Sequence, residues 1–336
     1  MDLTQIRCPN CLCQEIEKHT AYTTKNFGSR IIYKCRQCKC SFSETKNTFI
    51  ENLKKPISLI VRIIDARTDG LGLNAACRVF SVAKNTIIEW ETRFADVKPT
   101  LMLYTLVHEF LEVTIEGDEL YTKVEKNVPA DESRGWTIVL MDRASRFILE
   151  LQCGRKERRL FRKVIRTLCK LIKKAKDLSL LTDGERRYGN LLFEICREVI
   201  RNGKRGRPKR TLPKGVKVRI KNKGSQTHKR GPKRPKYQAP WPEHPETVQD
   251  IEDEEIHANH VEGFNSSMRR RNAAYRRRTN TYAKSDEGLQ RTLDVYWIVH
   301  NFVRVHFTTR QVPAVALGIL KKGLSLNEIF MIQKVA

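Results

Sequence analysis

The chain has 336 residues and is 40% hydrophobic, which is enough to build two or three packed domains. Its 64 Lys and Arg outnumber 38 Asp and Glu, and the net charge of +26 favours a polyanionic partner that relieves the self-repulsion. No apolar run approaches the ~20 residues of a membrane span, and the first residues lack the charged-then-apolar pattern of a secretory signal. We therefore expect a cytoplasmic protein that binds nucleic acid and no membrane, with a basic ribosome-associated factor as the alternative.

Six of the ten cysteines lie in the first forty residues, in two Cys-x-x-Cys pairs with 23 residues between them. In a reducing compartment, cysteines paired in this way usually bind metal, and four thiolates on two tight turns suit tetrahedral Zn²⁺. Short β-favouring pieces between the pairs indicate a zinc ribbon over residues 1–50. The predicted ligands are Cys8, Cys11, Cys35 and Cys38. Cys13 and Cys40 are competing candidates, and reduced structural cysteines are the alternative.

Residues 51–98 have the pattern of a helix-turn-helix. Apolar residues fall at helical spacing over 56–66, and two shorter helices are expected at 75–80 and 84–94, joined by the tight turn Ser81-Val-Ala. Packing Ile87, Ile88 and Trp90 inward leaves one side of the last helix for a DNA groove or phosphates. The residues on that side are Lys84, Asn85, Thr86 and Arg93. An ordinary helical hairpin is the alternative.

The middle of the chain predicts an α/β layer. A helical stretch at 101–111 precedes a β-rich segment at 111–124 with Asp118 in its middle, and two strands are expected within 135–151. An amphipathic helix at 156–176 leads to a buried strand at 178–183 that ends in Asp183, and a helix at 188–200 follows. Acids at the ends of such strands lie where α/β sheets usually place their ligands.

A third acid, Glu262, stands at the head of a strongly basic helix. Carboxylates from different elements can hold a pair of Mg²⁺ ions about 4 Å apart for an in-line displacement at phosphorus. Arginines that follow Glu262 would then hold a DNA backbone beside the metals. These arginines are Arg269, Arg270, Arg271, Arg276, Arg277 and Arg278.

In their order along the chain, these motifs resemble the insertion-sequence-one family of bacterial transposases. The matching pieces include Cys-Pro-Asn-Cys, Gly-Asp118-Glu-Leu-Tyr, Leu-Thr-Asp183-Gly and Val-Glu262-Gly-Phe-Asn265, together with Asn301-Phe-Val-Arg-Val-His306. The resemblance implies an RNase H-like catalytic core behind the zinc ribbon and the helix-turn-helix. It also implies an Asp118–Asp183–Glu262 triad that uses Mg²⁺ (or Mn²⁺), hydrolysis at transposon ends, and attack of the freed 3′-hydroxyl on target DNA by a homo-oligomer.

The gap between Asp183 and Glu262 is longer than is usual in that family, because residues 201–257 have no counterpart. Asp142, Glu185 and Glu194 are therefore alternative third acids. Glu119 ranks lower, since it would face the other side of the strand from Asp118.

Residues 201–236 contain 16 Lys and Arg and no acid, and we expect a basic, partly disordered insert over 201–257. Arg205-Gly-Arg207-Pro resembles a minor-groove-binding AT-hook core, with a nonspecific electrostatic tether as the alternative. Residues 216–220 are a candidate exposed strand of the core sheet. The acidic run at 250–255 is either a shield for the basic surface or a linker.

The catalytic domain is thus expected at 108–200 and 258–310, followed by a tail at 311–336. His300 and His306 are predicted to be structural, although they could approach the metals. The competing functions are an inactive zinc and helix-turn-helix DNA-binding regulator derived from a transposase, and an RNase H-like nuclease or resolvase.

Overall fold

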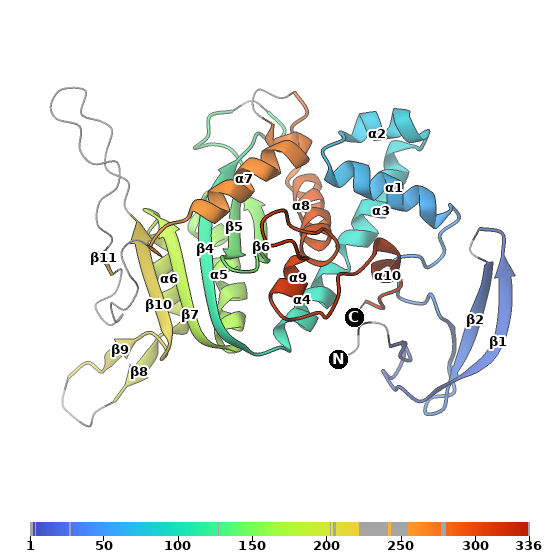
Figure 1. Cartoon of the computed structure of the whole chain (residues 1–336), viewed down its shortest axis with the longest axis horizontal. Helices are drawn as coiled ribbons and strands as arrows, with labels where there is room; N and C mark the ends of the chain where they lie inside the picture. Colours follow the sequence, from blue (N-terminus) through green and yellow to red (C-terminus); the bar gives the residue numbers. More distant parts are fainter. Residues whose placement is uncertain are drawn as a thin grey trace.

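The computed structural model describes residues 3, 5–26, 28–126, 128–201, 203, 206–221, 241–242, 255–276 and 280–334. A six-stranded mixed sheet lies at the centre of these residues (Figure 1). Its order is β11–β10–β7–β4–β5–β6, with bounds β4 (Phe110–Tyr121), β5 (Trp136–Asp142), β6 (Ile148–Gly154), β7 (Ala175–Asp183), β10 (Val216–Lys221) and β11 (Trp241–Pro242). The chain is a mixed α/β protein, as its sequence predicts.

Strand directions divide the sheet into two halves. β4, β5 and β6 form an antiparallel meander, whereas β7 and β10 run parallel to β4 on its other side. The parallel strands need crossover connections, and α5 (Arg158–Ile172) supplies the one that leads to β7. As a result, β4, β7 and β10 all end at the same edge of the sheet.

Helices cover both faces of the sheet. α5 and α6 (Arg187–Cys196) bury one face, which we call the α5 face, around residues such as Ile138, Leu140 and Leu180. α7 (Asn259–Arg271) crosses the opposite face, the α7 face, and α8 (Asp286–Phe302) packs beside it against β6 (Figure 1). The alternation of side chains along β4 therefore decides which face each acid of that strand reaches.

The helices predicted before the sheet are present as α1 (Ile57–Thr68), α2 (Leu73–Phe80) and α3 (Lys84–Ala95), followed by α4 (Lys98–Leu106). They share one hydrophobic core with the α7 face of the sheet and with α8. Buried ion pairs strengthen this junction. Glu91 of α3 accepts from Arg67 of α1 and from Arg291 of α8, at 2.6 and 3.3 Å.

The first fifty residues form a small separate sheet of β1 (Ile16–Thr24), β2 (Gly28–Cys35) and β3 (Ser41–Ser43). The β1–β2 hairpin extends away from the rest of the molecule (Figure 1). Few apolar side chains support it, and its core consists of Cys8, Cys35 and Phe42. A module with so small a core needs a further source of stability.

The basic segment contains more structure than its composition predicts. β8 (Glu198–Ile200) pairs with β9 (Lys209–Thr211), and β10 is an inner strand of the main sheet. The strand predicted at 216–220 is thus confirmed, but its expected exposure is wrong. Val218 and Ile220 are buried because β10 lies between β7 and β11 and packs against the α5 face.

The tail joins the amino-terminal modules to the rest of the chain. It contains the short helices α9 (Pro313–Ala316) and α10 (Leu326–Phe330), and a 3-10 turn, η2 (Ala273–Tyr275), precedes α8. Phe330 stacks on Phe49 at 4.2 Å between ring centroids and meets Phe94 of α3 edge-on at 5.5 Å. The backbone of Lys334 also donates to the Asn47 carbonyl.

Two cysteines depart from the expectation of reduced thiols. Cys169 of α5 and Cys196 of α6 are joined in a disulfide with their Cα atoms 6.5 Å apart. The sequence spacing did not reveal this pair, because the two helices meet only when they pack on the same face of the sheet.

Among the described helices, none is both long and apolar enough to cross a membrane.

Candidate active site and metal centre

Asp118 and Asp183 lie on neighbouring parallel strands at the same level of the sheet. The last paired residues of β4 and β7 are Gly117 and Thr182, and each aspartate follows its strand partner by one residue. Neighbouring strands are about 5 Å apart, and side chains at the same level of two strands point to the same face. Both carboxylates are thus on the α7 face, close to the edge where the parallel strands end.

α7 lies over this pair and contacts it directly. The Asn265 Nδ2 atom donates to Asp118 Oδ2 at 2.7 Å, and Asn265 itself is buried. Glu262 is three residues earlier and hence on the same side of the helix, about one turn towards its amino end. The position of Glu262 at the head of a basic helix agrees with the sequence prediction.

The three predicted acids do not form a closed cluster. Within the described ranges, only two groups of three or more metal-ligating side chains have all their ligand atoms within 4.8 Å of one another, and neither contains Asp118, Asp183 or Glu262. The Glu262 side chain is exposed to solvent. The structure therefore brings the two aspartates to adjacent positions and puts Glu262 on the covering helix, without gathering all three carboxylates.

The side chains beside the two aspartates carry oxygen atoms of the kind that could act as metal ligands. Asp118 and Asp183 supply carboxylate oxygens, the type of ligand that Mg²⁺ prefers. In the part of the chain that the structure describes, the buried Oδ1 atom of Asn265 has no hydrogen-bond partner, although the same amide contacts Asp118. A buried acceptor of this kind is costly unless water or a cation satisfies it.

Glu116 anchors α7 at this site, and the sequence analysis did not identify it. This fully buried carboxylate accepts from the backbone N–H groups of His260 and Val261, both at 3.0 Å, in the first turn of α7. Arg143 donates to it at 2.7 Å, and so does the His260 ring, also at 2.7 Å. The negative charge faces the positive end of the helix dipole, so it holds the amino end of α7 against β4.

The signal for Glu116 was its position two residues before Asp118. Alternation along a strand puts both acids on one face, where a buried charge must be paired. Its four donors explain why a charged residue is tolerated there. His257 completes the second group of metal-ligating atoms, but the Arg143 guanidinium already occupies the position of a cation beside Glu116.

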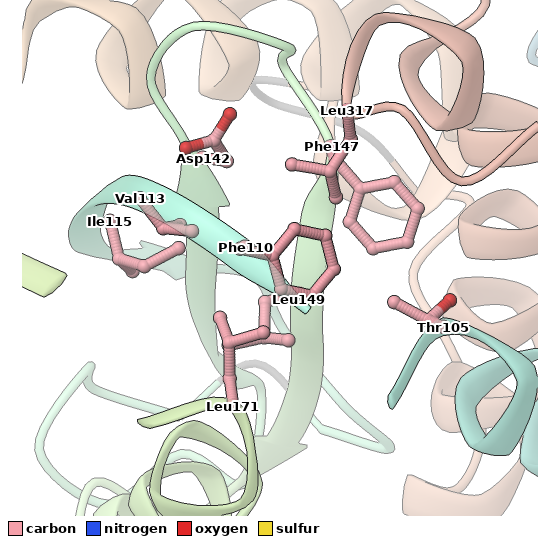
Figure 2. A pocket seen from close by; sticks show the side chains of 9 residues that line it. All are labelled: Thr105, Phe110, Val113, Ile115, Asp142, Phe147, Leu149, Leu171 and Leu317. Carbon is pink, nitrogen blue, oxygen red and sulfur yellow. The ribbon is translucent and has the colours of Figure 1, made fainter. Parts of the chain in front are cut away.

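The alternative third acids lie elsewhere. Asp142 pairs with Ile115 and lies at one end of a small apolar cavity that Val113, Leu149 and Leu171 also line (Figure 2). Burial raises the pKa of Asp142, although Ser145 donates to it through its hydroxyl and its backbone N–H. Asp142 is thus a structural turn residue on the wrong side of the sheet.

Two further acids are bound in ion pairs. Glu194 of α6 pairs with Arg158 and with Arg162, and Glu185 pairs with Arg187 two residues along the chain. α6 covers the α5 face, so Glu194 lies on the far side of the sheet from Asp118. Glu119 pairs with Lys156 at 2.8 Å and lies near Tyr188 of α6, which confirms that it faces away from Asp118.

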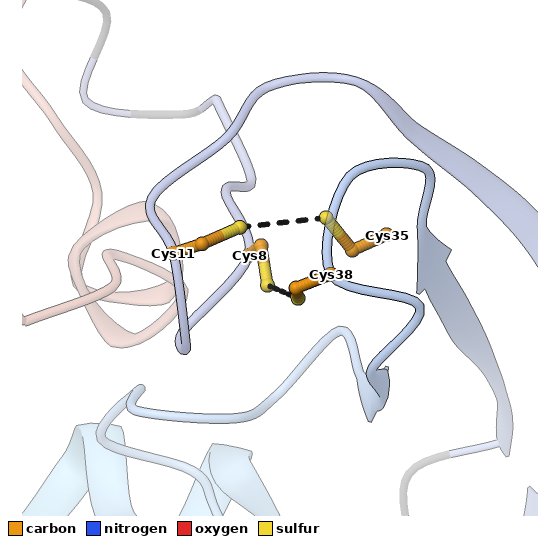
Figure 3. Close-up of side chains that lie close together, drawn as sticks. All are labelled: Cys8, Cys11, Cys35 and Cys38. Carbon is orange, nitrogen blue, oxygen red and sulfur yellow. Dashed lines mark hydrogen bonds between the residues drawn. The ribbon is translucent and has the colours of Figure 1, made fainter.

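The four predicted metal-binding cysteines converge on one point (Figure 3). The sulfur atoms of Cys8 and Cys38 are 3.5 Å apart, and those of Cys11 and Cys35 are 3.6 Å apart. Cys13 and Cys40 are outside this group and contact nearby backbone instead. The chain thus contains a four-cysteine cluster that can bind a structural metal such as zinc.

The two cysteine turns have the same geometry, which shows why Cys-x-x-Cys spacing suits this site. The Cys8 carbonyl accepts a hydrogen bond from the backbone N–H of Leu12, and the Cys35 carbonyl accepts one from that of Lys39. Leu12 and Lys39 both have a φ of 60°. Hydrogen bonding to the Cys40 backbone lowers the pKa of Cys38 to about 6. A backbone bond at Cys13 favours the Cys11 thiolate, but burial and the neighbouring thiols raise its pKa to about 12. A bound cation would remove this repulsion between thiolates.

The expected DNA-facing side of α3 is only partly available. Lys84 and Asn85 are exposed, and Thr86 is half-buried at the start of the helix. Arg93 is not free, since it donates to the Glu51 carbonyl at 2.7 Å and pairs with Glu89 at 2.8 Å. The prediction for Arg93 is corrected accordingly, because its side chain holds α3 against the segment that precedes α1.

The arginines predicted around Glu262 and in the insert have different environments. Arg270 is exposed, Arg269 and Arg271 are half-buried on α7, and Arg207 is exposed between β8 and β9. Arg276 donates to the Gly70 carbonyl at 3.0 Å and so has a structural contact that the sequence did not predict. Three predicted residues lie outside the described residues: Arg205, Arg277 and Arg278. So does most of the acidic run at 250–255.

His300 is structural, as predicted. Its Nε2 atom is 2.9 Å from the Arg146 carbonyl, its ring stacks on Tyr296, and burial lowers its pKa to about 3. Burial also lowers the pKa of His306, which lies edge-on to His300. A neutral His300 ring is thus part of the packing between α8 and the β5–β6 turn.

No known protein-family description matches the chain, and no curated protein matches it. The residues of the site are therefore the basis for inferring a function.

Proposed function

We propose that this protein is a DNA transposase of the insertion-sequence-one type, with an RNase H-like core as its catalytic domain. The order β6–β5–β4–β7–β10, with three antiparallel strands followed by two parallel ones, supports that core. A cysteine-ligated ribbon and a three-helix unit before the sheet supply the end-binding modules, and the net charge of +26 suits a DNA partner.

The observation that carries the proposal is the placement of Asp118 and Asp183. These residues are 65 positions apart in the sequence, yet they occupy adjacent strands at one level and one face of the sheet. Two carboxylates that share a site repel each other, and a divalent cation between them relieves the repulsion. Asp118, Asp183 and the Asn265 amide would hold Mg²⁺, which supplies activation of an attacking oxygen and stabilisation of a leaving oxygen at phosphorus.

The chain's own residues would position the DNA and the third acid. Asn265 holds Asp118 in place, and Glu116 fixes the amino end of α7, from which Glu262 projects. Arg269 and Arg270 on the same helix would hold phosphates beside the acids. Glu262 is the proposed third acid because the alternatives Asp142 and Glu194 lie on the α5 face.

The test compares charge-removing variants of equal size. Asp118→Asn and Asp183→Asn should each reduce Mg²⁺-dependent cleavage by at least about 100-fold while DNA binding persists, because only the charge that holds the cation is lost. Cleavage is measured on a plasmid that carries the gene with its flanking DNA. Glu194→Gln, an acid on the other face, is the matched control and should cut normally.

If both aspartate variants cut at the wild-type rate, the catalytic assignment is wrong. If the wild-type protein binds the flanking DNA and never cuts it, the protein is an inactive DNA-binding regulator and not a transposase.

A further inference from the structure

A basic groove beside α5 has no role in the function proposed so far. It encloses about 580 Å³ between the amino-terminal half of α5, the end of β6 and the start of α8. Asp286 and Glu157 are the acids on its walls. Its basic residues, which we call the α5 groove cations, are Arg134, Arg155, Arg159, Arg162, Lys163 and Arg166.

Within the described residues, three of the four groove cations on α5 have no ion pair. Arg162 pairs with Glu194, and Arg155 is 3.9 Å from Glu157. Arg159, Lys163 and Arg166 are exposed, and the described residues offer none of the three an ion pair or a hydrogen bond from the side chain. Like charges held close together without counter-charges destabilise the folded chain, and an anionic partner removes that cost.

The spacing of the unpaired cations fits an extended polyanion better than a single ion. Arg159, Lys163 and Arg166 follow one another at four and three residues, so they form a stripe on one side of α5. The stripe is about 10 Å long at 1.5 Å per residue. Duplex DNA carries about six phosphate charges over that length of its axis.

The groove also opens at the end of the sheet where the candidate acids lie. Gly154 ends β6 and pairs with Trp136, which in turn pairs with Tyr121, three residues beyond Asp118 on β4. β6 is two strands from β4, or about 10 Å across the sheet. A duplex at this edge can therefore reach both the groove and the acids.

We propose that the α5 groove cations bind the backbone of duplex DNA as a contact separate from α3 and α7. This inference rests on the proposed function for the choice of DNA as the partner. The expected contacts are to phosphates, which carry no sequence information, so this binding should be independent of base sequence.

The experiment measures binding of the full-length protein to a 40-base-pair duplex of arbitrary sequence over a range of KCl concentrations. The groove variant combines Arg159→Gln, Lys163→Gln and Arg166→Gln. Each lost phosphate contact should reduce the slope of log K against log salt by about 0.9, so we expect a total decrease of about 2–3. Affinity at 150 mM KCl should fall more than about tenfold.

A matched control removes the same charge elsewhere. Lys173→Gln, Lys176→Gln and Lys321→Gln change exposed lysines outside the groove, two of them at the opposite end of α5, and should change the slope by less than about one. The variant Arg159→Lys with Arg166→Lys keeps the charges and should retain the wild-type slope. Thermal unfolding of each variant shows that it is folded.

Equal slopes for the groove variant and the control would overturn the inference. Tripolyphosphate that competes fully with the duplex at equal phosphate concentration would also overturn it, because the groove would then be a site for a small anion. Failure of the proposed function gives a different result. The wild-type protein then does not cut DNA, while the groove variant still shows a smaller slope of log K against log salt than the wild type.

Discussion

At the scale of single residues, a buried carboxylate decides how the candidate site is built. Glu116 is fully buried and accepts hydrogen bonds from four donors, so its side chain is held in one position. It connects β4, which carries Asp118, to α7, which carries Glu262. A local change at Glu116 should therefore affect both stability and the position of the helix.

Glu116→Gln should lower the free energy of unfolding by about 3–5 kcal/mol, because Arg143 is left as an unpaired charge beside a buried amide. Urea unfolding measures this loss. Glu89→Gln, which breaks the exposed pair with Arg93, is the control and should change stability by less than about 1 kcal/mol. A loss at Glu116 no larger than the control's would contradict the anchoring role.

Because His300 is buried, we expect the stability of the fold to depend on pH. Its folded pKa of about 3 lies below the unfolded value of about 6.5, so between these values the unfolded chain binds a proton that the folded chain does not. The free energy of unfolding should thus decrease as the pH falls from 6.5 towards 3, by at most about 1.4 kcal/mol per pH unit from this group.

Urea unfolding between pH 7.5 and 5 tests the assignment. In His300→Gln the decrease over this range should be about 2 kcal/mol smaller than in the wild type, while His19→Gln, an exposed histidine on β1, should keep the wild-type decrease. The same pH profile in all three proteins would show that His300 does not control it.

At the scale of elements, we expect the β1–β3 module to depend on its cysteine cluster for stability. Its few buried apolar side chains cannot hold β1–β3 together, and metal binding and folding are coupled in modules of this size. The ribbon should bind one zinc ion and lose it to a strong chelator, with loss of amide-exchange protection over β1 and β2.

A cysteine pair in the same module gives the matched comparison. Cys8→Ser should abolish zinc binding and exchange protection, whereas Cys13→Ser should keep both, because the Cys13 sulfur is outside the cluster. Metal content by elemental analysis and hydrogen exchange measure the two effects. Zinc retained in Cys8→Ser and lost in Cys13→Ser would reverse the ligand assignment.

At the scale of the whole molecule, the helical unit before the sheet is an integral part of the fold. Gly70, in the turn after α1, has a φ of 99°, and a Cβ atom there would lie 2.8 Å from the Arg270 carbonyl oxygen at the end of α7. Burial would lower the pKa of Lys98, but ion pairs with Glu150 and Asp294 raise it overall. These contacts connect the predicted DNA-binding helices to the candidate catalytic sheet.

The sequence alone predicted what depends on local spacing. The Cys-x-x-Cys pairs identified the four cysteines that cluster, helical periodicity located α1, α3 and α5, and β-favouring runs located β4 to β7. Even the opposite orientations of Asp118 and Glu119 followed from strand alternation. Such features are encoded within a few residues, where geometry leaves little choice.

Features that depend on pairing between distant segments became visible only in the folded chain. β10 is an inner strand because β7 and β11 flank it. Arg93 donates a hydrogen bond to the Glu51 carbonyl, and Asp142 lies on the α5 face. The role of Glu116 as an anchor depends on α7, which lies more than 140 residues later and packs its first turn against β4. Burial and ion pairing arise from which surfaces meet, and residue spacing along one segment does not contain that information.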